Sequence, residues 1–154
     1  MSVRSAVPAD FDAVVAVMDE WWGRPVHAIL PRLFLDHFCD TSFLAEGAEG
    51  LAGFLVGFPS QARRDESYIH AAAVSPKCRG DGIGRELYQR FFDASTFSGR
   101  PVVCAITSPF NEESIAFHRR LGFKVSDPVP DYDGPGVDRV KFHIDLRLNK
   151  GTDR

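Results

Sequence analysis

A glycine-rich loop between two apolar segments carries the clearest chemical signal in this 154-residue chain. The loop, Arg79–Gly84, contains three glycines and follows the apolar run Tyr68–Val74. The first turn of a helix leaves four N–H groups without partners at the positive end of its macrodipole, and glycines let an anion approach them closely. With Arg79 and Arg85 at its ends, the loop is predicted to bind phosphate. After the loop, apolar residues recur at every fourth position, as on one face of a helix: Ile83, Leu87 and Phe91.

The spacing of the glycines distinguishes three phosphate-binding motifs. A Walker A loop requires Gly-Lys followed by Ser or Thr, which is absent, and a Rossmann fingerprint requires a third glycine where Leu87 stands. The third pattern resembles the acetyl-coenzyme A loop of the GNAT N-acetyltransferase superfamily, including the strand before it. The residues that carry this resemblance are Val74-x-Pro76-x-x-Arg79-Gly80-x-Gly82-Ile83-Gly84-x-x-Leu87.

A second group of polar residues lies in the segment Asn111–Phe123. At about 100° per residue of an α-helix, Asn111, Ser114 and His118 fall within the apolar sector that faces inward. A polar group buried there without a partner costs on the order of 1–3 kcal/mol, so each of the three needs one. Asn111 can act as a helix N-cap. A histidine in such a place is more often structural than catalytic, although its ordinary pKa suits acid–base chemistry.

The spacing of these three residues, followed by Leu121-Gly122-Phe123, is similar to the second GNAT signature. Together the two motifs imply an enzyme that transfers an acetyl group from acetyl-CoA to a primary amine by direct attack in a ternary complex. The resemblance implies that the loop amides bind the pyrophosphate of CoA and that the preceding strand pairs with its pantetheine arm. The residues implied in binding acetyl-CoA are Ala72, Ala73, Val74, Arg79, Gly80, Asp81, Gly82, Ile83, Gly84, Arg85, Asn111 and Ser114.

The catalytic residues are marked less clearly than the cofactor loop. His118 stands where the family usually has tyrosine, whose hydroxyl protonates the departing thiolate; an imidazolium or a water could also donate, and His118 is the candidate general acid. The glutamate that some members use as a base is missing, because Ala105, Ile106 and Thr107 occupy that region. Tyr68 and His70 share one face of the central strand. They are candidates for holding a water that accepts the amine proton, or for core positions.

Two other classes of function compete with this interpretation. The missing tyrosine and glutamate favour, as the alternative, a catalytically degenerate module that binds acyl-CoA as a sensor. A dinucleotide-binding oxidoreductase conflicts with the glycine spacing and with the late position of the loop. The acceptor, a small molecule or the amine of a protein or peptide, is not identified by the signature residues, although Asp36, Asp131 and Asp133 hint at a cationic amine.

The helices and strands expected from the sequence form a single predicted domain over 1–148, followed by a predicted frayed tail over 149–154. Their order predicts an α/β fold on a mixed sheet, and the resemblance implies a GNAT-like three-layer α/β/α sandwich. Expected helices are 10–22 with Asp10 as N-cap, 31–38, 83–98 and 111–121. Expected strands are 3–6, 41–46, 51–58, 68–74, 101–106, 123–126 and 140–146.

Composition limits the setting in which this chemistry takes place. A chain that is 44% hydrophobic and 25% charged is typical of a soluble globular protein. The net charge of −3 argues against nucleic-acid binding, and no apolar run is long enough to span a membrane. Three scattered cysteines indicate a reduced compartment, so a cytoplasmic location is expected. No residues have the spacing of a metal site, so no metal is expected, and the sequence is compatible with a homodimer.

Overall fold

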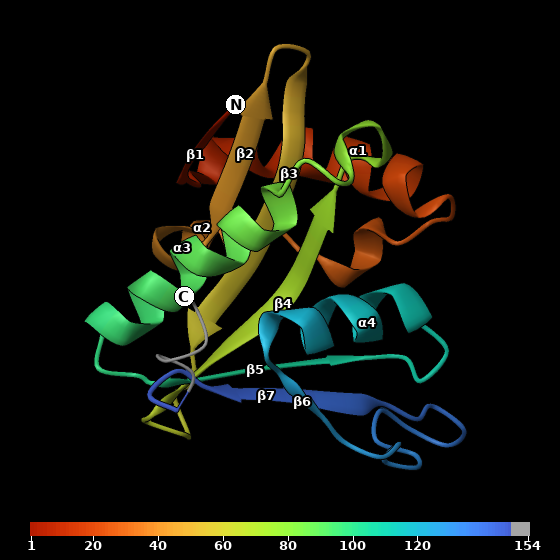
Figure 1. Cartoon of the computed structure of the whole chain (residues 1–154). Coiled ribbons are helices and arrows are strands. Elements are labelled where there is room, and N and C mark those ends of the chain that lie inside the picture. The colour runs from red at the N-terminus through yellow and green to blue at the C-terminus, as the bar shows by residue number, and fades with distance from the viewer. Residues whose placement is uncertain (149–154) are drawn as a thin grey trace. The chain divides into compact units, whose positions relative to one another are not determined.

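The structure, a computed structural model, describes residues 1–148 (Figure 1). The tail expected over 149–154 lies outside the described residues. Two compact units are distinguished, Met1–Pro59 with Ile69–Ala94, and Ser60–Tyr68 with the chain from Ser95 onward. The single domain expected over 1–148 stays a prediction.

The first unit is built on strands that pair in the order β1, β2, β3 and β4. β1, β2 and β3 are antiparallel, and a two-residue turn joins β2 to β3. The strands are β1 (Ser2–Ser5), β2 (Phe43–Gly47), β3 (Gly50–Pro59) and β4 (Glu66–Val74), of which the part from Ile69 belongs here. The helices are α1 (Phe11–Trp22), α2 (Leu33–Phe38) and α3 (Ile83–Phe97), with single turns η1 (Pro8–Asp10), η2 (His27–Ile29), η3 (Cys39–Thr41) and η4 (Pro76–Cys78).

The core of this unit explains why its helices pack where they do. α1 is buried through Val14 and Met18, which belong to one cluster with Leu35 of α2. The sheet side of the same cluster includes Phe54 and Val56 of β3. All five side chains are at or near zero exposure, so burial of apolar area is the main stabilising term here.

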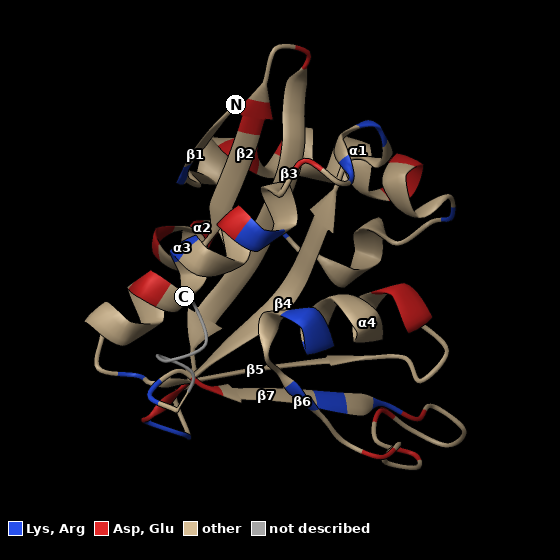
Figure 2. Ribbon diagram, in the orientation of Figure 1, with Lys and Arg blue, Asp and Glu red and all other residues tan. Residues whose placement is uncertain are grey.

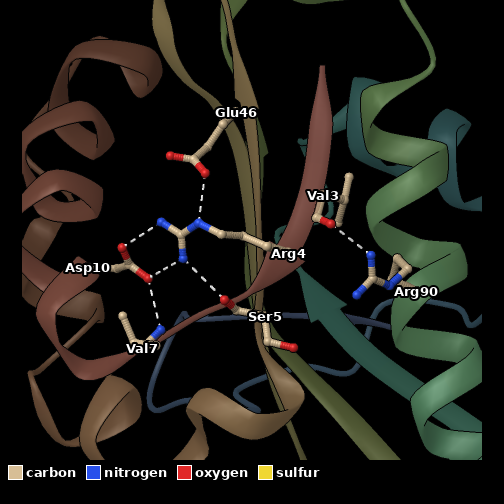
Figure 3. Close-up of polar contacts among 7 residues, drawn as sticks. All are labelled: Val3, Arg4, Ser5, Val7, Asp10, Glu46 and Arg90. Carbon is tan, nitrogen blue, oxygen red and sulfur yellow. Dashed lines mark hydrogen bonds and ion pairs between the residues drawn. The ribbon is translucent and has the colours of Figure 1, made fainter.

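Asp10 has a different role from the one predicted. It was expected to cap the helix that follows, but its side chain makes no such bond, and α1 begins at Phe11. Its carboxylate instead accepts the Val7 N–H at 2.8 Å and both terminal nitrogens of Arg4 at 2.8 and 2.9 Å (Figure 3). The Arg4 guanidinium also donates to Glu46 at 2.7 Å, and its hydrogen bonds lower the pKa of Asp10. Asp10 therefore ties β1 to the turn η1 rather than initiating α1.

The second unit contains the remaining strands and one complete helix. The first three residues of β4, Glu66–Tyr68, pair in parallel with β5 (Val102–Thr107). β7 (Val140–Asp145) pairs antiparallel with β5 on one side and with β6 (Lys124–Val125) on the other. α4 spans Glu112–Leu121 and ends at Gly122, whose φ of 101° is the left-handed conformation in which helices commonly end at glycine.

The two units together confirm the predicted class, an α/β fold on a mixed sheet with one parallel strand–helix–strand unit, β4–α3–β5. Differences from the predicted bounds are small. Thr41 belongs to η3 rather than to a strand, because the Ser42 N–H closes this turn on the Cys39 carbonyl at 3.2 Å. Among residues 1–148, no helix is long and apolar enough to cross a membrane. The cytoplasmic location stays a prediction.

Candidate active site

The phosphate-binding loop predicted from the sequence is a turn that leads into α3. Ser75 begins it, accepting the Lys77 N–H on its hydroxyl at 3.4 Å and the Cys78 N–H on its carbonyl at 2.9 Å. Gly80 and Gly82 then take φ of 94° and 79°, which L side chains rarely adopt. A Cβ built on either glycine would meet no protein atom within 4 Å, so the space on the Cβ side of both glycines is open.

The backbone N–H groups of this turn are arranged to bind an anion. Within residues 1–148, the N–H groups of Gly80, Gly82, Ile83, Gly84 and Arg85 have no hydrogen-bond acceptor. Glu86 is the first residue of the turn whose N–H is bonded in helical fashion, to the Gly82 carbonyl at 3.0 Å. Unpaired donors at a helix start, with the dipole behind them, suit the two phosphates of a pyrophosphate.

β4 leads into this turn with one edge that is not fully paired. Its register with β5 covers only Glu66–Tyr68, while Ala72, Ala73 and Val74 are half-buried and lie beyond it. Ser75 remains tied to β3, because its N–H donates to the Ala52 carbonyl at 2.8 Å. Backbone groups at 72–74 are therefore placed where an extended ligand could add to a strand edge.

The two weak candidates on β4 have different surroundings. His70 donates its Nε2–H to the Ile29 carbonyl at 2.5 Å and stacks on Phe34 with 4.0 Å between ring centres. In the neutral ring this bond leaves Nδ1 as the nitrogen that can accept a proton. Burial, with Tyr132 and Asp133 nearby, raises the pKa of Tyr68 to about 12, so Tyr68 stays a phenol at neutral pH.

Asn111, Ser114 and His118 are brought together on α4 as their spacing predicts. The Asn111 side-chain oxygen accepts the Ser114 N–H at 3.2 Å, which makes Asn111 the N-cap, and its amide donates to Thr107 Oγ1 at 3.2 Å. The Ser114 carbonyl lies 2.7 Å from His118 Nδ1. Since a carbonyl only accepts, Nδ1 carries the proton.

His118 lies inside an aromatic cage. Only 5% of its surface is exposed, its ring stacks on Phe142 with 3.9 Å between ring centres, and Phe123 approaches edge-on at 5.0 Å. Burial in this apolar setting lowers the pKa of His118 to about 4. At neutral pH the ring is uncharged, and its one proton is held by the Ser114 carbonyl.

Some features of these sites were missed by sequence reasoning. Thr107, which the sequence analysis names only where the family's glutamate is missing, bonds to Asn111, and its position four residues before Asn111 is the one signal that could have indicated this. The contact between Phe142 and His118 joins residues 24 apart in the chain, which alternation alone cannot pair. Two of the three acids suggested for a cationic acceptor are engaged in their own loop: Asp133 pairs with Arg139 at 2.8 Å, and Asp131 accepts the Gly136 N–H at 2.7 Å, whereas Asp36 lies on α2.

A metal was not expected, and that expectation stays a prediction. Within the described part of the chain, no three His, Cys, Asp or Glu side chains are grouped to hold one. Cys104 lies 3.1 Å from Glu66 Oε1, and burial raises the pKa of its thiol to about 12. The Cys104 side chain is therefore a neutral thiol rather than a thiolate nucleophile.

Comparisons with known proteins agree with the two motifs. The model of the acetyltransferase (GNAT) family matches residues 11–123. The chain is 27% identical over 143 residues to the L-methionine sulfoximine/L-methionine sulfone acetyltransferase of Pseudomonas aeruginosa, covering 84% of this chain and 83% of that protein. It is 29% identical over 85 residues to the L-2,4-diaminobutyric acid acetyltransferase of Vibrio parahaemolyticus, covering 55% and 47%.

Solved structures share the fold at lower identity. Ard1 from Thermoplasma volcanium superposes with a TM-score of 0.76 at 22% identity, covering 93% of this chain and 95% of that one. The structure of yncA, a putative acetyltransferase from Salmonella typhimurium with its cofactor acetyl-CoA, gives 0.74 at 22% identity, covering 95% and 94%. These likenesses show that the chain has the fold of these acetyltransferases.

The cage around His118 predicts a specific loss of stability in acid. The pKa of His118 is about 4 in the folded chain and about 6.5 in the unfolded chain. Between pH 4 and pH 6.5 the imidazole is therefore protonated in the unfolded chain and neutral in the folded chain. The stability is therefore complete above about pH 6.5 and falls as the pH drops toward 4. From pH 7 to 4.5, urea unfolding should lose about 2 kcal/mol more in the wild type than in His118→Phe. Equal losses in the two proteins would mean that His118 is charged when folded.

Proposed function

Because the chain belongs to the acetyltransferase (GNAT) family, we propose that it transfers the acetyl group of acetyl-CoA to the amine of a free amino acid. The observation that carries the choice of acceptor is the match, over 84% of this chain, to a relative named for acetylating methionine derivatives. A second relative is named for acetylating diaminobutyric acid, which is also a small amino acid. The family predicted from the two motifs is confirmed, and with it an N-acetyltransferase.

The residues present fit acetyl-CoA. Five unpaired N–H groups between Gly80 and Arg85 would bind the pyrophosphate, with Arg79 and Arg85 exposed beside them. Backbone groups of Ala72–Val74 would pair with the pantetheine arm. Asn111 and Ser114 are proposed as further contacts, although each already serves the N-cap of α4. When bound, acetyl-CoA supplies the thioester.

The reaction proposed is direct attack in a ternary complex. A neutral amine adds to the thioester carbonyl, the new C–N bond forms, the C–S bond breaks, the nitrogen loses a proton and the thiolate gains one. Cys104 is unsuited to an acyl-enzyme route because it is held as a thiol. His70 Nδ1, acting through a water, is the better of the two candidate bases, since the raised pKa of Tyr68 disfavours its phenolate.

The binding loop can be tested at Gly82. Valine there would strain the backbone and place methyl groups on the open side of the turn, where the anion approaches. We expect Gly82→Val to raise the dissociation constant of CoA by at least about tenfold in calorimetry, which is about 1.4 kcal/mol, and Arg85→Ala to raise it less.

Gly99 offers a matched control for the strain itself. Its φ of 78° equals that of Gly82 within a degree, and a Cβ there also meets nothing within 4 Å. Gly99→Val should therefore cost similar stability and leave CoA affinity unchanged. If both valine variants bind CoA like the wild type, the cofactor site lies elsewhere.

The role of His118 as general acid stays a prediction, and its surroundings oppose it. An acid that must be charged at neutral pH conflicts with a pKa near 4, and the proton on Nδ1 is already donated to Ser114. We expect His118→Phe to keep kcat within about threefold at pH 8, with a water protonating the thiolate. A loss of about 10²–10⁴-fold, the usual range for an acid–base group, would establish the acid role instead.

The acceptor is tested by a panel of amines with CoA release as the readout. Methionine sulfone, methionine sulfoximine and 2,4-diaminobutyrate should give kcat/KM values at least about tenfold above those of tetrapeptides with a free N-terminus or of polyamines. N-acetylmethionine sulfone, which lacks the amine, is the matched control and should not react. A preference for peptides would refute the amino-acid proposal. Binding of CoA without any turnover would favour the sensor alternative.

A further inference from the structure

The outward face of α4 carries charges in a symmetric order. Glu112 and Glu113 form its first turn, Arg119 and Arg120 its last, and Ala116 lies midway between the two pairs. All five residues are exposed. In Figure 2 the acidic first turn and the basic last turn stand at opposite ends of this helix.

The four charged side chains have no ion-pair partner within residues 1–148. The helix macrodipole favours acids in the first turn and bases in the last, so it accounts for the two ends. The macrodipole does not account for the equal distance of the acidic pair and the basic pair from Ala116. Counted from Ala116, the charges stand at −4, −3, +3 and +4.

This spacing is self-complementary under a two-fold axis. With a rise of about 1.5 Å per residue, an antiparallel copy of α4 centred on Ala116 places Glu112 level with Arg120 of the copy, and Glu113 level with Arg119. Two such helices can approach to about 8 Å when the residue at the crossing is as small as alanine. Every charge then faces an opposite one, and each contact occurs twice.

Apolar surface of the same unit extends this face beyond the helix. Phe110, just before α4, is 90% exposed, the most exposed of the large apolar side chains in the described chain. A groove beside α4 has a mixed lining of apolar and polar residues: Pro109, Glu112, Ile115, Ala116, Arg119, Val125, Ser126, Asp127, Pro128 and Val140. A helix about 15 Å long cannot supply the roughly 800 Å² per partner of a specific interface, so this surface would provide the rest.

We propose that the chain forms a two-fold symmetric homodimer in which α4 packs antiparallel against α4 of a second copy. The occupant of the face is a second copy because the charge order complements itself. The groove of mixed lining and Phe110 flank the helix pair. Asn111, Ser114 and His118 are not part of the contact, so dimerisation does not depend on the proposed function.

Charge reversal gives a test in which two defective variants repair each other. Glu112→Arg/Glu113→Arg makes the face wholly basic, and Arg119→Glu/Arg120→Glu makes it wholly acidic. Each should raise the dimer dissociation constant at least about tenfold in analytical ultracentrifugation, because like charges then face each other. An equimolar mixture should form a heterodimer, seen by native mass spectrometry, since every facing pair is again opposite.

Controls separate the contact from net charge and from folding. Glu20→Arg/Glu49→Arg changes the charge equally, on exposed residues outside the second unit, and should stay dimeric. Circular dichroism checks each variant, because the reversals also oppose the helix dipole. If they unfold, Ala116→Glu, at the exposed axis, should dissociate the dimer and keep the fold. A monomeric wild type at 100 µM, variants that all stay dimeric, or a mixture that stays monomeric would each overturn the proposal.

Discussion

Unpaired backbone donors at the start of α3 are the constraint on which the proposed chemistry depends. They exist because Gly80 and Gly82 turn the chain with positive φ and bring it into the helix without supplying acceptors. A side chain at either position would strain the turn and cover the donors. Arg79 and Arg85 should matter less for CoA binding than these amides. An arginine adds attraction for the anion, whereas the amides form the site that the phosphates fit.

Sequence reasoning reached most of the fold because local patterns and packing agree in this chain. All four helices were predicted within about two residues of their ends, and β2 and β3 follow from two apolar runs separated by a segment that begins and ends with glycine. The errors lie where a side chain bonds to a distant element. Asp10 has every feature of an N-cap, yet Arg4 and Val7 compete for its carboxylate. A one-dimensional pattern holds no information about such a competitor.

The arrangement of the candidate residues was predictable from the sequence, and their chemistry less so. The glycine loop and the row of Asn111, Ser114 and His118 are local in sequence, so spacing alone placed them correctly. The protonation state of His118 is not local. It is decided by Phe142, which β7 brings against the ring, and by the loss of water around it. Residue type suggests an acid with a pKa near neutrality, and burial removes that property.

α4 shows how one short helix can serve two purposes without conflict. Its inward residues are fixed by the N-cap at Asn111 and by the hydrogen bond from His118 to Ser114, so they tolerate little change. Its outward residues are exposed, so their charges can change without altering the inward hydrogen bonds. Residues three and four apart lie on one face of a helix, so the two faces hardly share positions. A contact with a second copy could therefore be gained or lost while the inner face, and whatever it does for acetyl-CoA, stays unchanged.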